Sequence, residues 1–403
     1  MNFIEGGVCA PIGFKAGGVH CGIRKHTDKK DLALIVSEVR ASSASVYTQN
    51  LVKGAPILVT KENIKDGMAQ AIICNSGNAN TCNSDGIDVA KQMCQLTEKY
   101  TGINRNDVIV ASTGVIGQKL NIEPIASKMN LLTASLGNNS ADAAAAIMTT
   151  DTVKKEFAIE FEIGGVKCRL GGIAKGSGMI HPNMATMLVF ITTDVSIKSE
   201  MLQKALSEDV KTSFNMISVD GDTSTNDMVS ILANGLAQNR TIDNEGEDFA
   251  KFKKALNMVT VYLCRQIAAD GEGASKLLEC KVSGAKTADN ARAAAKSVIC
   301  SALFKAAMFG ADANWGRVLC ALGYSGEDLD VNKIDVSFKS QKGEILVCKS
   351  GAGVDFSEEK AKEILVEKEI EILIALNDGQ FSATAWGCDL TYDYVRINGD
   401  YRS

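Results

Sequence analysis

Alternation of apolar and polar residues predicts strands along the first half of the chain. Residues 156–163, EFAIEFEI, are apolar at every second position from Phe157 to Ile163, which is typical of a strand with one solvated face. The run TMLVFITTD (186–194) is apolar on both sides, so we expect it to lie between two layers. Further short strands are predicted at LALIVSEV (32–39), ILVT (57–60), AIICNSG (71–77) and DVIVAST (107–113).

Helical spacing separates some of these runs. In SDGIDVAKQMCQLTEKY (84–100), the apolar residues that begin with Ile87 share one face. The same spacing predicts a helix over 199–213. An alanine-rich segment predicts a helix over about 289–309, with Gly310 suited to the position after its end.

A further set of strands and helices is predicted beyond residue 280. Strands are predicted at KIDVSFKS (333–340), EILVCKSG (344–351), EIEILIAL (369–376) and DLTYDYVRING (389–399), with a helix that begins near Ser357.

Strands and helices in mixed order, with a central strand buried on both faces, predict an α/β (α+β) fold of stacked sheets flanked by helices. One mixed sheet with helices on both sides is an alternative that the pattern leaves open. We predict a larger sandwich domain over 1–275 and a smaller α/β domain over 276–403.

Composition excludes several classes of protein. The chain has 403 residues, 45% hydrophobic and 23% charged, as in an ordinary globular protein. Its net charge of -5, with both signs mixed along the chain, lacks the basic footprint that nucleic acid or an anionic membrane requires. No apolar stretch approaches the ~20 residues of a membrane helix. The amino terminus, MNFIEGG, has no secretory pattern, so we expect a cytoplasmic protein.

Metal and cofactor motifs are missing. The 12 cysteines include no C-x-x-C pair, and a chain of this length does not need disulfides, so we expect buried thiols. With 3 histidines, a histidine-rich metal site is not expected. The sequence has no P-loop, no dinucleotide-binding glycine motif that opens a helix, and no G-x-S-x-G elbow.

A nucleophile that works without histidine needs another base. A threonine at a newly formed amino terminus carries its own α-amine, with an ordinary pKa of about 7.7–8.0. Thr186 follows the glycine-rich loop KGSGMIHPNMA and opens the apolar run, so cleavage between Ala185 and Thr186 would create such a terminus. A threonine that simply opens a strand is common, and the spacing by itself favours that interpretation.

Other segments offer matching chemistry. Thr113 and Gly114 follow the strand DVIV, where a hydroxyl and a backbone N–H could hold an oxyanion, although S-T-G is also an ordinary turn. Lys175 could bind a substrate carboxylate, and Glu272, between two glycines, a ligand ammonium; both could equally face water. Turn-rich polar segments at MTTDT (148–152), VDGDTSTND (219–227) and DANWGRV (312–318) remain open in the same way.

Together these segments resemble the glutamate N-acetyltransferase/ornithine acetyltransferase family almost end to end. KGSGMIHPNMATML (175–188) is similar to the family's self-cleavage segment. Supporting segments occur in family order: NSGNAN (75–80), ASTGVIG (111–117), MTTDT, DGDTSTND (220–227), EGASK (272–276), NWGRV (314–318) and YVRINGDYRS (394–403).

The resemblance implies a precursor that cuts itself between Ala185 and Thr186, into an α segment (1–185) and a β segment (186–403). Its core would be of the αββα, N-terminal-nucleophile type, and the segments would remain together as an α2β2 assembly. Thr186 would take the acetyl group from N2-acetylornithine and pass it to glutamate in arginine biosynthesis, by a ping-pong transfer. No metal or tightly bound cofactor is implied, and acetyl-CoA is a further acetyl donor for some relatives.

The resemblance also assigns residues by position. Thr113 and Gly114 match the oxyanion pair. Thr150 is preferred over Thr149 as a substrate contact. Ser403 stands where relatives often have threonine and keeps the hydroxyl. The substrate-contacting set is Thr150, Lys175, Thr186, Glu272, Asn398 and Ser403.

Glu272 suits the ammonium of ornithine and opposes the side-chain carboxylate of glutamate, so we expect another donor, Asn398, to moderate this conflict. The alternative function is a related self-processing aminopeptidase or amidohydrolase, in which water resolves the acyl-enzyme. A metabolite-binding protein whose threonine only opens a strand would leave the chain uncut.

Overall fold

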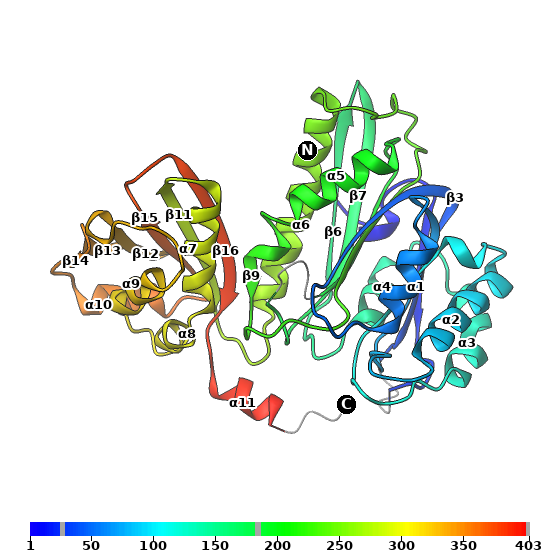
Figure 1. Cartoon of the computed structure of the whole chain (residues 1–403), viewed down its shortest axis with the longest axis horizontal. Helices are drawn as coiled ribbons and strands as arrows, with labels where there is room; N and C mark the ends of the chain where they lie inside the picture. Colours follow the sequence, from blue (N-terminus) through cyan, green and yellow to red (C-terminus); the bar gives the residue numbers. More distant parts are fainter. Residues whose placement is uncertain (25–28, 182–186, 400–403) are drawn as a thin grey trace.

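Two β-sheets and their covering helices make up the computed structural model, which describes residues 1–24, 29–181 and 187–399 (Figure 1). The first sheet has nine strands in the order β1-β6-β7-β8-β10-β3-β4-β5, with β2 paired to β3. Its strands are β1 (Asn2–Ile4), β2 (Phe14–Val19), β3 (Leu32–Tyr47), β4 (Met68–Asn75), β5 (Val108–Ser112), β6 (Lys155–Ile163), β7 (Val166–Lys175), β8 (Leu188–Thr193) and β10 (Met228–Ala233).

The first sheet folds back on itself at β3. The pairing of β3 with β4 shifts register between Val36 and Ala41, so the two halves of β3 belong to different arms of the sheet. One apolar cluster joins inward side chains of β4 and β5, such as Ile72 and Ile109, with those of β8 and β10, such as Phe190. The two arms therefore stack face to face, as the fold class predicted from sequence requires.

Helices cover the outer faces of both arms. On the β4–β5 side lie α1 (Ala55–Asn63), α2 (Gly86–Thr101) and α3 (Glu123–Ala134). On the other side lie α5 (Ser199–Asp209) and α6 (Glu247–Ala269), while α4 (Ser140–Ile147) packs into the cluster between the arms. All six residues of β8 are buried, so the predicted two-layer burial is confirmed.

The second sheet has seven strands in the order β14-β13-β12-β15-β11-β16-β9. The helix α7 (Ala288–Cys300) packs against β11 and β16, and α8 (Ala302–Phe309), α9 (Trp315–Gly323) and α10 (Glu358–Leu365) complete the layer. Its strands are β9 (Ile217–Ser218), β11 (Leu277–Ala285), β12 (Asp335–Ser340), β13 (Gly343–Lys349), β14 (Ala352–Gly353), β15 (Glu369–Ala375) and β16 (Phe381–Cys388).

The domain division at 275/276 stays a prediction. The strand β9 comes from the predicted first domain, yet it pairs with β16 in the second sheet. The final helix α11 (Tyr392–Asn398) leaves that sheet and runs back toward the first one (Figure 1).

Three sequence predictions of secondary structure were wrong. Residues 57–60 form part of α1 rather than a strand, because Pro56 in the first turn fixes a helical φ. The predicted final strand over 389–399 contains the helix α11 instead, and the Thr391 hydroxyl before it accepts hydrogen bonds from the N–H groups of Asp393 and Tyr394. The alanine-rich helix is broken at Ser301, whose hydroxyl caps α8, and Gly310 has an ordinary right-handed φ of -73°.

Two smaller details also differ. Ile87 on α2 is 42% exposed, and Val89 takes its place on the buried face. The helix predicted over 199–213 ends at Asp209.

All twelve cysteines are free, and eight of them are buried. Within the described ranges, no helix is both long and apolar enough to cross a bilayer, and no three His, Cys, Asp or Glu side chains gather as metal ligands.

Candidate active site

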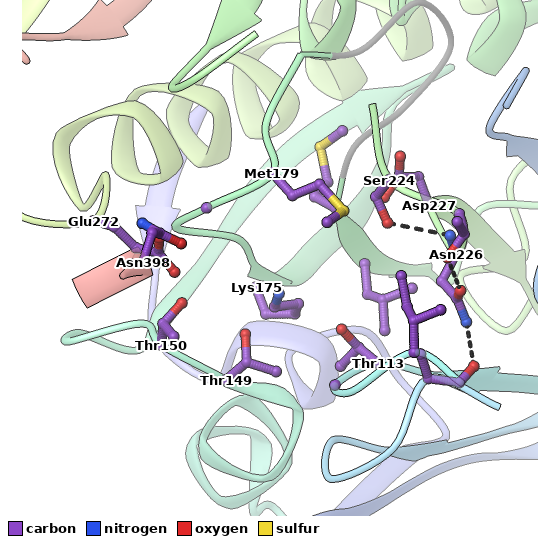
Figure 2. A pocket seen from close by; sticks show the side chains of 17 residues that line it. Thr113, Thr149, Thr150, Lys175, Met179, Ser224, Asn226, Asp227, Glu272 and Asn398 are labelled. Atoms are coloured by element: carbon purple, nitrogen blue, oxygen red, sulfur yellow. Dashed lines mark hydrogen bonds between the residues drawn. The ribbon is translucent and has the colours of Figure 1, made fainter. Parts of the chain in front are cut away.

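A cavity of about 120 Å³ lies where β5, β7 and β8 meet the segments before β11 and after β16 (Figure 2). The predicted oxyanion pair, Thr113 and Gly114, lines it together with Lys175, Glu272 and Asn398. Thr149 and Thr150 both line it as well, so the geometry leaves the choice between them open.

Three predicted site residues, Ala185, Thr186 and Ser403, lie outside the described residues. The description resumes at Met187, which lines the cavity.

Gly114 approaches a neighbouring loop too closely for any side chain. Its φ of +128° is a conformation that L-residues rarely adopt, and a Cβ there would lie 2.6 Å from the carbonyl carbon of Gly77 and 2.7 Å from Asn78 N. Thr113 is fixed beside it, since its N–H donates to the Asn75 carbonyl at 3.0 Å. The loop 75–80 therefore sets the backbone at the candidate oxyanion site.

Asn226 ties three segments together beneath this site. Its Nδ2 donates to the carbonyls of Ala79 (2.6 Å) and Ser112 (2.9 Å), while its Oδ1 accepts from the hydroxyls of Thr81 and Thr225. Ser224, Thr225, Asn226 and Asp227 all line the cavity. Sequence analysis singled out this segment as polar but assigned it no role, because its bonds join residues more than 100 positions apart.

Lys175 and Glu272 bring opposite charges to the cavity. Lys175 is the last residue of β7, and each of the two side chains belongs to a residue that is 8% exposed. Asn398 Nδ2 donates to Glu272 Oε2 at 2.7 Å, and Figure 2 shows these two residues together at one side of the cavity. Gly178 leaves room for this carboxylate, because a Cβ there would lie 2.4 Å from it.

The chain is anchored on both sides of the predicted cut. Met179 and Ile180 donate their N–H groups to the Asp220 carboxylate at 2.6 and 2.8 Å. The His181 carbonyl accepts from the Thr223 hydroxyl at 2.8 Å, and the Met187 carbonyl from Met228 N at 2.9 Å. These hydrogen bonds fix residues 181 and 187 to the neighbouring segments around Thr223 and Met228.

Burial perturbs the ionisable groups around the cavity. Burial would raise the pKa of Asp151, but the ammonium groups of Lys175 and Lys155 outweigh it and hold that pKa below its ordinary value. Burial, then the charge of Lys296, lowers the pKa of His181. Burial and the neighbouring Asp220 carboxylate raise the pKa of Tyr394.

One segment singled out by sequence lies elsewhere. Asn314 caps the start of α9, and DANWGRV does not line the cavity.

The residues that do line the cavity indicate the class of the protein. A mixed α/β fold carries a small cavity with a lysine, a glutamate and a close-packed glycine turn, which suits an enzyme that acts on a small charged molecule.

The chain belongs to the ArgJ family, whose sequence pattern matches residues 15–403. It is 50% identical over 405 residues to the arginine biosynthesis bifunctional protein ArgJ of Caldanaerobacter subterraneus subsp. tengcongensis, covering 100% of both chains. It is 51% identical to ArgJ 1 of Clostridium acetobutylicum, over 97% of this chain and 96% of the relative. A solved ArgJ structure from Bacillus halodurans, 48% identical, superposes with a TM-score of 0.51 over 53% of this chain and 99% of its own.

Proposed function

We propose that this protein transfers the acetyl group of N2-acetylornithine to glutamate, giving ornithine and N-acetylglutamate in arginine biosynthesis. The observation that carries the proposal is the cavity itself. It collects Thr113, Gly114, Lys175, Glu272 and Asn398 from distant parts of the chain, directly beside Met187. Membership of the ArgJ family supports the same reaction.

In the first half-reaction, the Thr186 hydroxyl attacks the acetyl carbonyl and passes its proton to the α-amine of the same residue. Thr113 and Gly114 stabilise the oxyanion by hydrogen bonds. The C–N bond then breaks, ornithine leaves with the proton, and the acetyl group remains on Thr186 as an ester. In the second half-reaction, the amine of glutamate attacks this ester, the ester C–O bond breaks, and the proton lost by the amine goes to the Thr186 oxygen, which gives N-acetylglutamate and restores the hydroxyl.

Substrate charges fit the two charged residues of the cavity. Lys175 pairs with the α-carboxylate that both amino acids carry. Glu272 pairs with the side-chain ammonium of ornithine. The amide of Asn398, already bonded to Glu272, offsets part of that negative charge when the carboxylate of glutamate occupies the same place.

The nucleophile requires self-cleavage between Ala185 and Thr186. The β segment would hold 403 − 185 = 218 residues, about 54% of the chain. The solved Bacillus halodurans chain is matched over 99% of its length but corresponds to 53% of this chain, as one separate segment would. We propose that the two segments stay together, as an α2β2 assembly in the cytoplasm, and that acetyl-CoA is a second acetyl donor.

The decisive experiment compares the intact masses of the wild type and Thr186→Ala. We expect two fragments from the wild type, and one uncut, inactive chain of 42.8 kDa from the variant. Fragments that persist in Thr186→Ala would refute self-cleavage by this threonine.

Product analysis separates acetyl transfer from the hydrolytic alternative. With acetylornithine and glutamate together, N-acetylglutamate should form in step with ornithine. Free acetate at the same rate with and without glutamate would instead identify an amidohydrolase.

A further inference from the structure

Behind the cavity lies a group of three charged residues that the acetyl transfer does not use. Lys155, at the start of β6, is 1% exposed, and its Nζ lies 2.7 Å from Asp151 Oδ1 and 2.5 Å from Asp270 Oδ2. We call Asp151, Lys155 and Asp270 the buried ion triad. A fully buried ammonium needs such partners, because an unpaired charge in the interior is strongly unfavourable.

Each carboxylate of the triad also holds a segment that lines the cavity. Asp151 accepts hydrogen bonds from Gly176 N at 2.7 Å and from Thr149 N at 2.9 Å. It therefore fixes the backbone directly after Lys175 and the loop of the two candidate threonines.

Asp270 connects the triad to Glu272. Its carboxylate accepts from Thr152 N at 3.0 Å, and its own carbonyl accepts from the Ser177 hydroxyl at 2.6 Å. Glu272 N in turn donates to the Ser177 carbonyl at 2.9 Å. The triad thus sets the spacing between the lysine and the glutamate of the cavity.

The triad also lies close to Lys175. Among the described residues, Lys175 Nζ makes no hydrogen bond or ion pair, although the Asp151 carboxylate is close enough to feel its charge. Lys155, Gly176 N and Thr149 N occupy the oxygens of Asp151 instead. The lysine of the cavity is consequently left available to a ligand.

We propose that the buried ion triad is a positioning device for the substrate carboxylate: Lys155 takes up the Asp151 carboxylate that would otherwise pair with Lys175, so that Lys175 can bind the α-carboxylate of the substrate. The identity of the substrate rests on the proposed function. Asp151 and Lys155 precede the predicted cut and Asp270 follows it, so in a cleaved protein the triad would join the two segments.

The test replaces Lys155 by methionine. Without the ammonium, Asp151 pairs with Lys175 and competes with the substrate carboxylate. We expect KM to rise about tenfold or more for both acetylornithine and glutamate, the usual scale for losing a hydrogen bond to a charged group, with a smaller change in kcat. The control is Lys154→Met, at the exposed neighbouring position, for which both constants should stay as in the wild type.

A double variant separates positioning from a merely structural role. Asp151→Asn removes the competing charge while its amide oxygen can still accept from Gly176 N. In the Lys155→Met/Asp151→Asn protein we therefore expect KM to return most of the way to the wild-type value. A double variant whose KM stays as high as that of Lys155→Met, or rises further, would overturn the proposal.

Binding measurements keep the test independent of catalysis. In calorimetry, Lys155→Met should weaken the binding of ornithine. The binding of 1,4-diaminobutane, which is the same molecule without its carboxylate, should stay nearly unchanged. Equal weakening of both ligands overturns the triad's role even if acetyl transfer is confirmed. An inactive wild type that nevertheless shows this selective weakening refutes the proposed function alone.

Should Lys155→Met fail to fold, Thr152→Val offers a milder change at an exposed position. It deletes the hydroxyl that donates to Asp270 and keeps the ion pairs. We expect about a twofold rise in KM for both substrates. An unchanged KM in this variant would count against the proposal.

Discussion

The two sheets of this protein differ in how they meet solvent. The nine-stranded sheet stacks its two arms on each other and covers both outer faces with helices, so its central strands are buried throughout. The seven-stranded sheet is covered by α7 on one face, while charged side chains on β11, β12 and β15 form ion pairs around Glu279 and Glu371. Most of the described residues that line the cavity belong to the first sheet and its loops.

Among the described residues, the second sheet contributes to the cavity only through the segments that lead into it and out of it. Glu272 precedes β11, and Asn398 lies in α11, after β16 (Figure 1). The first sheet and its loops therefore supply most of the described lining of the cavity, while the segments next to the second sheet bring Glu272 and Asn398 to its rim. The following substitutions test this division, from the largest expected effect to the smallest.

Phe338→Ala in β12 should reduce stability without changing chemistry. Phe338 is fully buried in the core of the second sheet, and removal of such a ring costs about 3–5 kcal/mol of unfolding free energy. Denaturant unfolding measures the loss, and kcat of the folded variant should match the wild type. A large drop in kcat in a variant that still folds would show that the second sheet does more than support the rim of the cavity.

Gly114→Ala should, in contrast to Phe338→Ala, change the chemistry rather than the stability. A Cβ at this position collides with the backbone of Gly77 and Asn78, which displaces the candidate oxyanion donors. We expect kcat to fall about 10²–10³-fold, the scale for losing one oxyanion donor. The matched control is Gly117→Ala, where φ is also positive (+79°) but a Cβ meets open space. Equal losses in both variants would mean that backbone strain, and not displacement of the donors, is responsible.

Glu272→Gln tests the rim of the cavity, at the segment that leads into the second sheet. The change removes the charge that pairs with the ornithine ammonium, and steady-state kinetics should show KM for acetylornithine rising about tenfold, as for a lost charge-assisted hydrogen bond. KM for glutamate should change little or fall, because a repulsion is removed. Equal weakening of both substrates would show that the charge-pairing role is wrong.

Lys296→Met tests the junction between α7 and β9. Lys296 Nζ donates to the carbonyls of Asn215 (2.6 Å) and Ile217 (2.7 Å), and burial lowers its pKa to about 8. Between pH 8 and the ordinary lysine pKa of about 10.4, the unfolded chain holds a proton that the folded protein has lost, so stability rises with pH there.

This contribution, at most about 1.4 kcal/mol per pH unit, should be absent from Lys296→Met. Denaturant unfolding at several pH values from 7 to 10.5 measures it as a difference in slope. Parallel curves for the two proteins would contradict the lowered pKa.

Lys281→Met should have the smallest effect. This side chain is 42% exposed and pairs with Glu279 and Glu371 on the open face of the second sheet. Solvent screens such pairs, so we expect a loss of less than about 1 kcal/mol and unchanged kinetics. A larger loss would show that this face is not solvated in the assembled protein.

Local patterns were sufficient for much of the fold. The period-two alternation of β6 and the fully apolar β8 were predicted correctly, because each pattern directly reflects which faces of a strand are buried. The sequence failed at residues 57–60 and 389–399, where β-forming side chains lie in helices. In both places the first turn of the helix, with Pro56 in α1 and Thr391 before α11, decided the structure.

The residues of the candidate site were likewise predicted only in part. From the sequence alone, chemistry suggested Thr113, Lys175 and Glu272 without excluding ordinary turns and solvated charges, and the resemblance between whole segments decided among them. The roles of Asn226 and Lys155 were not predicted. Their contacts reach residues more than 100 positions away, and no local pattern encodes such a partner.

The sequence by itself therefore determined those strands whose burial shows in a local pattern, such as β6 and β8, and which residue types could carry the chemistry. Only the tertiary structure decided that Lys175 remains unpaired among the described residues and that Asn398 lies on Glu272, at 2.7 Å. Those facts depend on the packing of β7, the segment before β11 and the final helix against one another, which brings together charges that are far apart along the chain.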